Sequence, residues 1–163
     1  MNKCIVRVRR ATITAFLVCT AILVSSCGSS SSTANPNSVT GNWSITLYNS
    51  SNVAAYVFTT TLNQANGSPT ISSPIAGSNL SLTTANKACF DATSSAKQTG
   101  LYTVSGNFNG LTATTVQLSV EGNPGTLSLL GTMASNSVSG SWSLASTGPE
   151  TCDKSGTFLM TRS

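Results

Sequence analysis

The sequence that follows Cys27 predicts an all-β domain, specifically an antiparallel, up-and-down β-barrel of about eight strands. Apolar and polar residues alternate with a period of two along most of it, which is typical of strands that bury one face. Short segments rich in Gly, Pro, Asn and Ser separate these runs. No stretch after Cys27 has a helical period of useful length. A two-sheet β-sandwich is the alternative architecture.

The first predicted strand is Gly41–Tyr48, in which Trp43, Ile45 and Leu47 share one face. The other runs with strand character are Val53–Leu62, Thr70–Ile75, Asn79–Thr84, Leu101–Phe108, Thr114–Glu121, Thr126–Ala134, Val138–Leu144 and Gly156–Arg162. The longest irregular piece, Ala85–Gly100, is expected to hold a short helical turn. Because the connections are short, consecutive strands are expected to pair as antiparallel hairpins.

The edges of such a sheet favour closure. An open meander would leave two strands unpaired along one side, and unpaired edges invite aggregation. Pairing of the first strand with the last removes both edges. Glycines inside the strand patterns, such as Gly131 and Gly140, suit the sharp bends of a small barrel. The sequence therefore favours a barrel over a sandwich.

Residues 1–26 have the three parts of a secretory signal peptide. Four basic residues come first, and the mostly apolar stretch Ala11–Val24 follows them. This stretch is too short for a permanent membrane span, which takes about 20 residues. The small residues Ser25 and Ser26 then precede Cys27.

The residues Val24-Ser25-Ser26-Cys27 resemble the lipobox of bacterial lipoproteins. The resemblance implies that the Cys27 sulfur carries a diacylglyceryl group, that the signal is cut just before Cys27, and that the protein is held to a membrane. Gly28 stands where some bacteria place Asp to retain lipoproteins in the inner membrane, so the resemblance favours the outer membrane. An ordinary signal peptide with a chance cysteine at the cut is the alternative.

Residues 27–38 are predicted to form the lipidated cysteine and a flexible spacer, because they are rich in Gly, Ser, Thr, Asn and Pro. Residues 39–163 are predicted to form the β-barrel domain. The preceding apolar segment is expected to be a signal helix.

The net charge of +4 comes entirely from the signal. After Cys27 the basic residues Lys87, Lys97, Lys154 and Arg162 balance the acidic residues Asp91, Glu121, Glu150 and Asp153, so the formal net charge is zero. The sequence contains no basic patch and no basic run interleaved with aromatic residues. Nucleic acid is therefore excluded as a partner.

Two cysteines remain in the predicted domain once Cys27 is assigned to the lipid, namely Cys89 and Cys152. In an exported chain, one remaining pair predicts one disulfide. It would close a loop of about 60 residues and contribute about 4 kcal/mol in the chain-entropy description. Two free thiols are the alternative. A metal site is not expected, since the chain has no His and the acids do not cluster with both cysteines.

Gly41-Asn42-Trp43 opens the first predicted strand, and Arg162 closes the last. This combination resembles the signature of lipocalins, which implies that Arg162 lies over the indole of Trp43 at the barrel floor. Avidin-like barrels also begin with Gly-x-Trp. The pattern occurs again at Gly140-Ser141-Trp142, and the central lipocalin motif and C-terminal helix are absent. Barrel shape without kinship, with both Trp as core residues, is the alternative.

Catalysis is not expected, and no cofactor is indicated. The chain lacks His, the commonest general base, and no motif places a base beside a serine. A Cys89–Cys152 bridge would bring Asp91 and Asp153 near Lys154, which we interpret as a surface salt-bridge cluster rather than an acid–base pair. Glu121 is interpreted as a solvated hairpin residue.

The sequence predicts an envelope lipoprotein whose domain is a structural or interaction module, with another envelope component as its partner. The alternative is a lipocalin-like carrier of a small apolar ligand. The periodic pattern does not separate the two, because inward residues pack a core in one case and line a pocket in the other. The large inward residues favour the filled interior.

Overall fold

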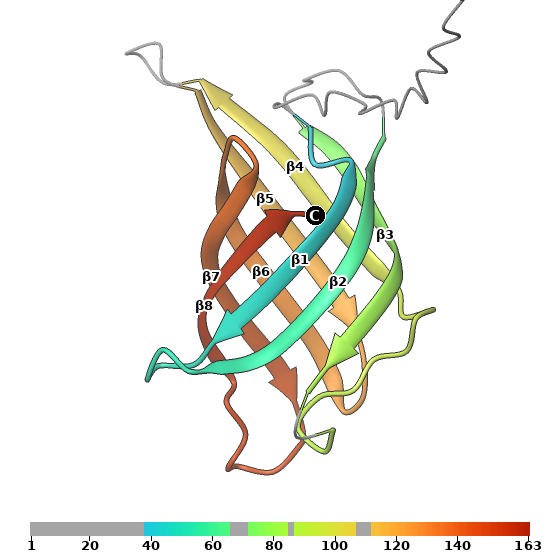
Figure 1. Cartoon of the computed structure of the whole chain (residues 1–163), viewed down its shortest axis with the longest axis vertical. Helices are drawn as coiled ribbons and strands as arrows, with labels where there is room; N and C mark the ends of the chain where they lie inside the picture. Colours follow the sequence, from blue (N-terminus) through green and yellow to red (C-terminus); the bar gives the residue numbers. More distant parts are fainter. Residues whose placement is uncertain (1–37, 66–71, 85–86, 107–111) are drawn as a thin grey trace, which may run out of the picture. The chain divides into compact units, whose positions relative to one another are not determined.

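The computed structural model describes residues 38–65, 72–84, 87–106 and 112–163 (Figure 1). The predicted signal peptide, Cys27 and nearly all of the predicted spacer lie outside these ranges. No helix within the described ranges is long and apolar enough to cross a membrane.

The described residues form a closed antiparallel barrel in which the strands follow sequence order (Figure 1). The strands are β1 (Gly41–Tyr48), β2 (Ala54–Gln64), β3 (Ser72–Thr83), β4 (Gln98–Gly106), β5 (Thr112–Glu121), β6 (Gly125–Ala134), β7 (Ser137–Ser146) and β8 (Ser155–Arg162). The first strand pairs with the last, from Trp43 opposite Arg162 to Tyr48 opposite Thr157. The predicted barrel is confirmed, and the sandwich alternative is wrong.

Strand β3 corrects the sequence-based expectation of two separate strands, Thr70–Ile75 and Asn79–Thr84. A β-bulge lies opposite Thr60, since Thr59 pairs with Ser81 while Thr61 pairs with Ser78. Asn79 there has a positive φ of 54°. The bulge shifts the alternation by one residue, so that Ile75 and Leu80 both point inward although their numbers differ in parity. One continuous strand therefore has a broken period in the sequence.

The segment predicted to hold a short helical turn is shorter and has no helix in its described part. Strand β4 begins at Gln98, and residues 87–97 fold as turns with one isolated bridge between Asp91 and Asn123. The bridge has two backbone hydrogen bonds: each residue's N–H donates to the other's carbonyl over 2.8 Å. This satisfies backbone groups that a helix would otherwise have satisfied.

Inward side chains of the strands fill the centre of the barrel. The largest of those that are fully buried are Trp43, Trp142, Tyr102, Phe58, Ile45, Leu47, Leu62, Leu118, Leu127, Leu129 and Met160. Large side chains face small positions: a Cβ added to Gly131 would lie 2.7 Å from the ring of Phe158. Phe158 on β8 thus extends across β7 to Gly131 on β6, and such matching of large with small residues fits bulky groups into a narrow barrel.

The outer wall of the barrel is almost free of charge. Within the eight strands, Glu121 at the end of β5 and Arg162 at the end of β8 are the charged residues. The other described charges lie in the β3–β4 and β7–β8 connections. Outward positions are mostly Ser and Thr, as expected for the solvated face of an antiparallel sheet.

Candidate functional site: the two closed ends of the barrel

One end of the barrel, which we call the Arg162 end, is where β1 begins and β8 ends. The guanidinium carbon of Arg162 lies 4.8 Å from the centroid of the Trp43 ring. The two residues are directly opposite in the paired strands, so closure of the barrel brings them together. The contact expected between Trp43 and Arg162 is confirmed, and such a stacked cation is attracted by the ring face.

Residues Ser38–Thr40 lie across the Arg162 end and are held there by side chains from three strands. Arg162 donates hydrogen bonds to the carbonyls of Ser38 and Thr40, the latter over 2.8 Å. Trp43 Nε1 donates to the carbonyl of Val39 over 2.7 Å. Gln64 Oε1 accepts from the Val39 N–H over 3.1 Å. Val39 is fully buried, so this segment closes the end of the barrel.

Gly41 explains why the Gly-x-Trp pattern accompanies this arginine. Its φ is +140°, a conformation that residues with a Cβ rarely adopt. A Cβ placed there would also lie 3.2 Å from Nη1 of Arg162. Burial lowers the pKa of the Arg162 guanidinium, and its Nε is buried without a hydrogen-bond partner among the described residues. The carbonyls of Ser38 and Thr40 compensate for part of that burial.

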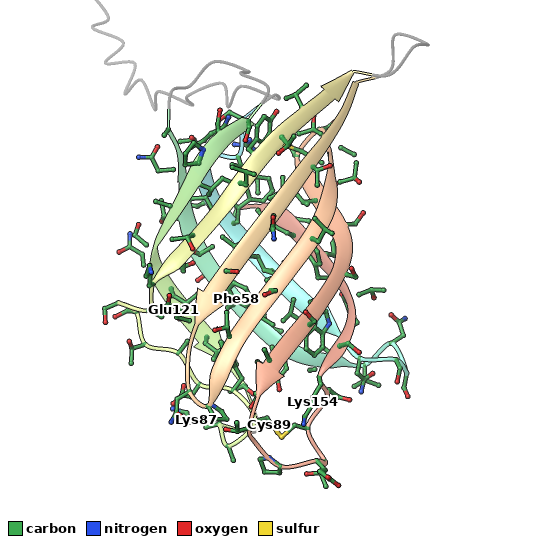
Figure 2. The ribbon with its side chains drawn as sticks, turned by 180° about the vertical axis from the view of Figure 1, so that it is seen from behind. Phe58, Lys87, Cys89, Glu121 and Lys154 are labelled. Carbon is green, nitrogen blue, oxygen red and sulfur yellow. A yellow bond between two sulfur atoms is a disulfide. The ribbon has the colours of Figure 1, made fainter. Side chains whose placement is uncertain are left out.

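The opposite end, which we call the disulfide end, carries the Cys89–Cys152 bond (Figure 2). Its Cα atoms are 5.4 Å apart, and the bond ties the β3–β4 connection to the β7–β8 connection. The predicted disulfide is confirmed.

Removal of this bond is expected to lower the free energy of unfolding by up to about 4 kcal/mol, because the unfolded chain regains the freedom of a long loop. Urea unfolding of the Cys89→Ala/Cys152→Ala protein measures the change. The wild type in a thiol reductant should match the double variant. Equal stability of the oxidised wild type and the double variant would contradict the expectation.

Phe90 enters the disulfide end beside the bridge. Its side chain is 1% exposed. Its ring meets Tyr56 edge-on at a centroid distance of 6.0 Å, and Tyr56 meets Trp142 edge-on at 5.6 Å. Trp142 Nε1 donates to the carbonyl of Tyr48 over 2.9 Å. Phe90 is a residue that no sequence pattern indicated, although its place next to a paired cysteine was a usable signal.

Tyr56 gives this aromatic cluster a pH dependence. Burial, and secondly the charge of Asp153, raises the pKa of its hydroxyl above the ordinary value. At alkaline pH the Tyr56 hydroxyl therefore stays protonated in the native state while it ionises in the unfolded chain. The free energy of unfolding is expected to fall as pH rises through about 10. Urea unfolding at several alkaline pH values should show a shallower fall for Tyr56→Phe than for wild type. Parallel curves for the two proteins would disprove this.

The acidic residues do not form the cluster that the sequence suggested. Asp91 pairs with Lys87 at 3.8 Å, whereas Asp153 accepts a hydrogen bond from Asn49 Nδ2 at 3.2 Å. Lys154 forms no ion pair within the described ranges. The expectation was wrong because each carboxylate contacts a different polar side chain: Asp91 contacts Lys87, and Asp153 contacts Asn49.

Glu121 lies exposed beside β6, as expected, and pairs with Lys97 at 3.2 Å. Exposed pairs of this kind contribute about 0–1 kcal/mol to stability. Asp91, Lys97 and Glu121 are among the residues that line a surface groove of about 340 Å³. In the part of the chain that the structure describes, no group of three His, Cys, Asp or Glu residues could hold a metal ion.

A polar pair also lies inside the barrel, on β2 and β4. Thr60 and Gln98 are each 2% exposed, and the Thr60 hydroxyl donates to Gln98 Oε1 over 2.6 Å. Gln98 Nε2 is buried without a hydrogen-bond partner among the described residues. The period-two pattern places Thr60 inward, but only the barrel shows which polar group it faces.

Comparison of the chain with models of known protein families, with sequences of characterised proteins and with solved structures gave no match.

Proposed function

We propose that this protein is a lipid-anchored lipoprotein of the bacterial envelope, at the outer membrane, and that its barrel is a structural or interaction module rather than an enzyme. The anchor rests on the signal pattern of residues 1–26 and on Cys27. Several acyl chains on one cysteine give stable anchoring, whereas one chain gives marginal binding.

The observation that supports a module over a carrier is the filled interior. A cavity that admits a molecule exposes part of the side chains that line it. Most inward apolar side chains of the strands that the structure describes are between 0% and 5% exposed, whereas Leu82, Val104 and Met133 are partly buried. A site for a drug-sized ligand has a volume of about 300 Å³ or more, and the part of the interior lined by these fully buried side chains is packed too closely to offer it.

The anchor would attach at the Arg162 end, because Ser38 and Thr40 are held there by Arg162. The length of chain between Cys27 and Val39 sets an upper limit of about 38 Å on the distance between the anchor and this end. The disulfide end, with most of the charged residues, would then face away from the membrane and toward other envelope components.

A lipocalin-like carrier is the second candidate, favoured by the stacking of Arg162 on Trp43 beside Gly41. Native mass spectrometry of protein isolated from membranes tests both candidates together. We expect the mass of a chain that begins at Cys27 plus its acyl groups, with no further molecule. A retained apolar compound at one per chain would favour the carrier, and a chain without acyl groups would refute the anchor.

A further inference from the structure

We propose that the disulfide end contains a binding site for one small aromatic ring, which the chain's own Phe90 occupies and the Cys89–Cys152 bond keeps closed. The proposal goes beyond the module role and does not depend on the lipid anchor. It concerns the disulfide end after the Cys89–Cys152 bond is broken and the β3–β4 connection moves away from the barrel.

Phe90 differs from the other buried aromatic residues in its origin. Of the buried aromatic side chains that the structure describes, it alone comes from a connection and not from a strand. It can therefore leave the core without breaking a strand pair of the barrel. Its neighbours on the strand side, Tyr56 and Trp142, are held by β2 and β7 and would stay in place.

The side chain of Phe90 packs between an aromatic ring and a glycine. Tyr56 offers its ring at 82° to the Phe90 ring, the edge-on arrangement that aromatic pairs favour. On another side lies Gly122, where an added Cβ would come within 2.5 Å of the Phe90 ring. Truncation of Phe90 would leave a void beside the Tyr56 ring and Gly122, and we expect this void to bind a small aromatic molecule, as apolar voids in proteins do.

The disulfide is the strongest tie on the connection. The connection is also joined to the barrel by the backbone bonds between Asp91 and Asn123, a backbone bond from the Glu121 N–H to the Lys97 carbonyl, and the ion pair of Lys97 with Glu121. Lys97 is 67% exposed, so that ion pair contributes little. Without the covalent bond, the connection can open locally while the barrel stays closed.

Opening of the bond is a thiol–disulfide exchange with a dithiol. One thiolate of the dithiol attacks a cysteine sulfur and forms a mixed disulfide, and its second thiol then displaces the chain. Cys89 and Cys152 end as thiols, and the dithiol ends as a disulfide, so two electrons and two protons are transferred. Both cysteines are more than nine-tenths buried, at 4% and 7% exposure, so we expect the exchange to be slow.

The test uses the full chain and fluorobenzene, observed by ¹⁹F line broadening. We expect Cys89→Ala/Cys152→Ala and Phe90→Ala proteins to bind this probe at least tenfold more tightly than oxidised wild type. Phe90→Leu, which leaves a smaller void, should lie between. Leu130→Ala, which removes an exposed side chain of β6, should match the wild type. Near-UV circular dichroism of the tryptophans verifies that each variant is folded.

Two results would overturn the proposal. If folded Phe90→Ala or Phe90→Leu protein binds no more probe than wild type, the site does not exist. If Phe90→Ala binds but the double cysteine variant does not, the disulfide is not what keeps the site closed. Neither result bears on the anchor, which the mass of the mature chain tests separately.

Discussion

Replacement of Cys27 by serine is expected to move this protein almost completely from the membrane fraction to the soluble fraction of the cell. In the proposed anchor the thioether to diacylglycerol forms on sulfur, so a serine at this position would leave the chain without acyl groups. We expect the acyl groups, and not the barrel wall with its mostly Ser and Thr outward positions, to hold the protein at the membrane. Membrane fractionation and metabolic labelling with a fatty acid measure the change.

Cys19 provides a matched control, because it lies in the same signal but outside the Val24–Cys27 box. The Cys19→Ser protein should be labelled and retained like the wild type. A Cys27→Ser protein that remains acylated and membrane-bound would refute the anchor and the orientation that we derive from it.

Replacement of Trp43 by alanine is expected to lower the free energy of unfolding by about 3–5 kcal/mol, the range for burial of a large aromatic residue. Trp43 is fully buried, donates to the Val39 carbonyl and lies beneath Arg162. The variant therefore loses apolar contacts, a hydrogen bond and the ring on which the guanidinium rests. Urea unfolding measures the loss.

A double-mutant cycle separates the stacking from the packing. Trp43→Ala and Arg162→Ala together should cost less than the sum of the two single changes, by about 0.5–2 kcal/mol. Trp142 is the control, because it packs against Tyr56 and not against Arg162. Trp142→Ala combined with Arg162→Ala should be additive. Additivity in the Trp43 cycle would mean that the guanidinium gains nothing from the ring.

Much of the architecture follows from residues that can be read along the chain. Trp43, Ile45 and Leu47 alternate with polar residues, and the structure buries all three. The pairing of Cys89 with Cys152 followed from elimination of the other three cysteines. Closure followed from the need to pair the first and last strands, and that closure places Arg162 opposite Trp43. Each of these inferences depends on the local alternation of apolar and polar residues, or on a pairing of cysteines or strands that has few alternatives.

Other features depended on contacts between segments far apart in sequence, which a period does not report. The bulge at Asn79 is defined by the register between β2 and β3, in which Thr59 and Thr61 pair with residues of β3. Asp153 accepts a hydrogen bond from Asn49, 104 residues away in sequence, and so is not joined to Asp91, which pairs with Lys87 four residues before it.

Phe90 and Gln64 show the same division between sequence and tertiary structure. Neither residue stands in a motif, yet one closes the disulfide end and the other binds the Val39 N–H at the Arg162 end. The sequence by itself determined which faces of the strands are buried, because alternation is a local property of each strand. Only the closed barrel decided what fills its two ends, because Phe90 lies in a connection and Gln64 at the end of β2, and the contacts of both are made with segments far away in sequence.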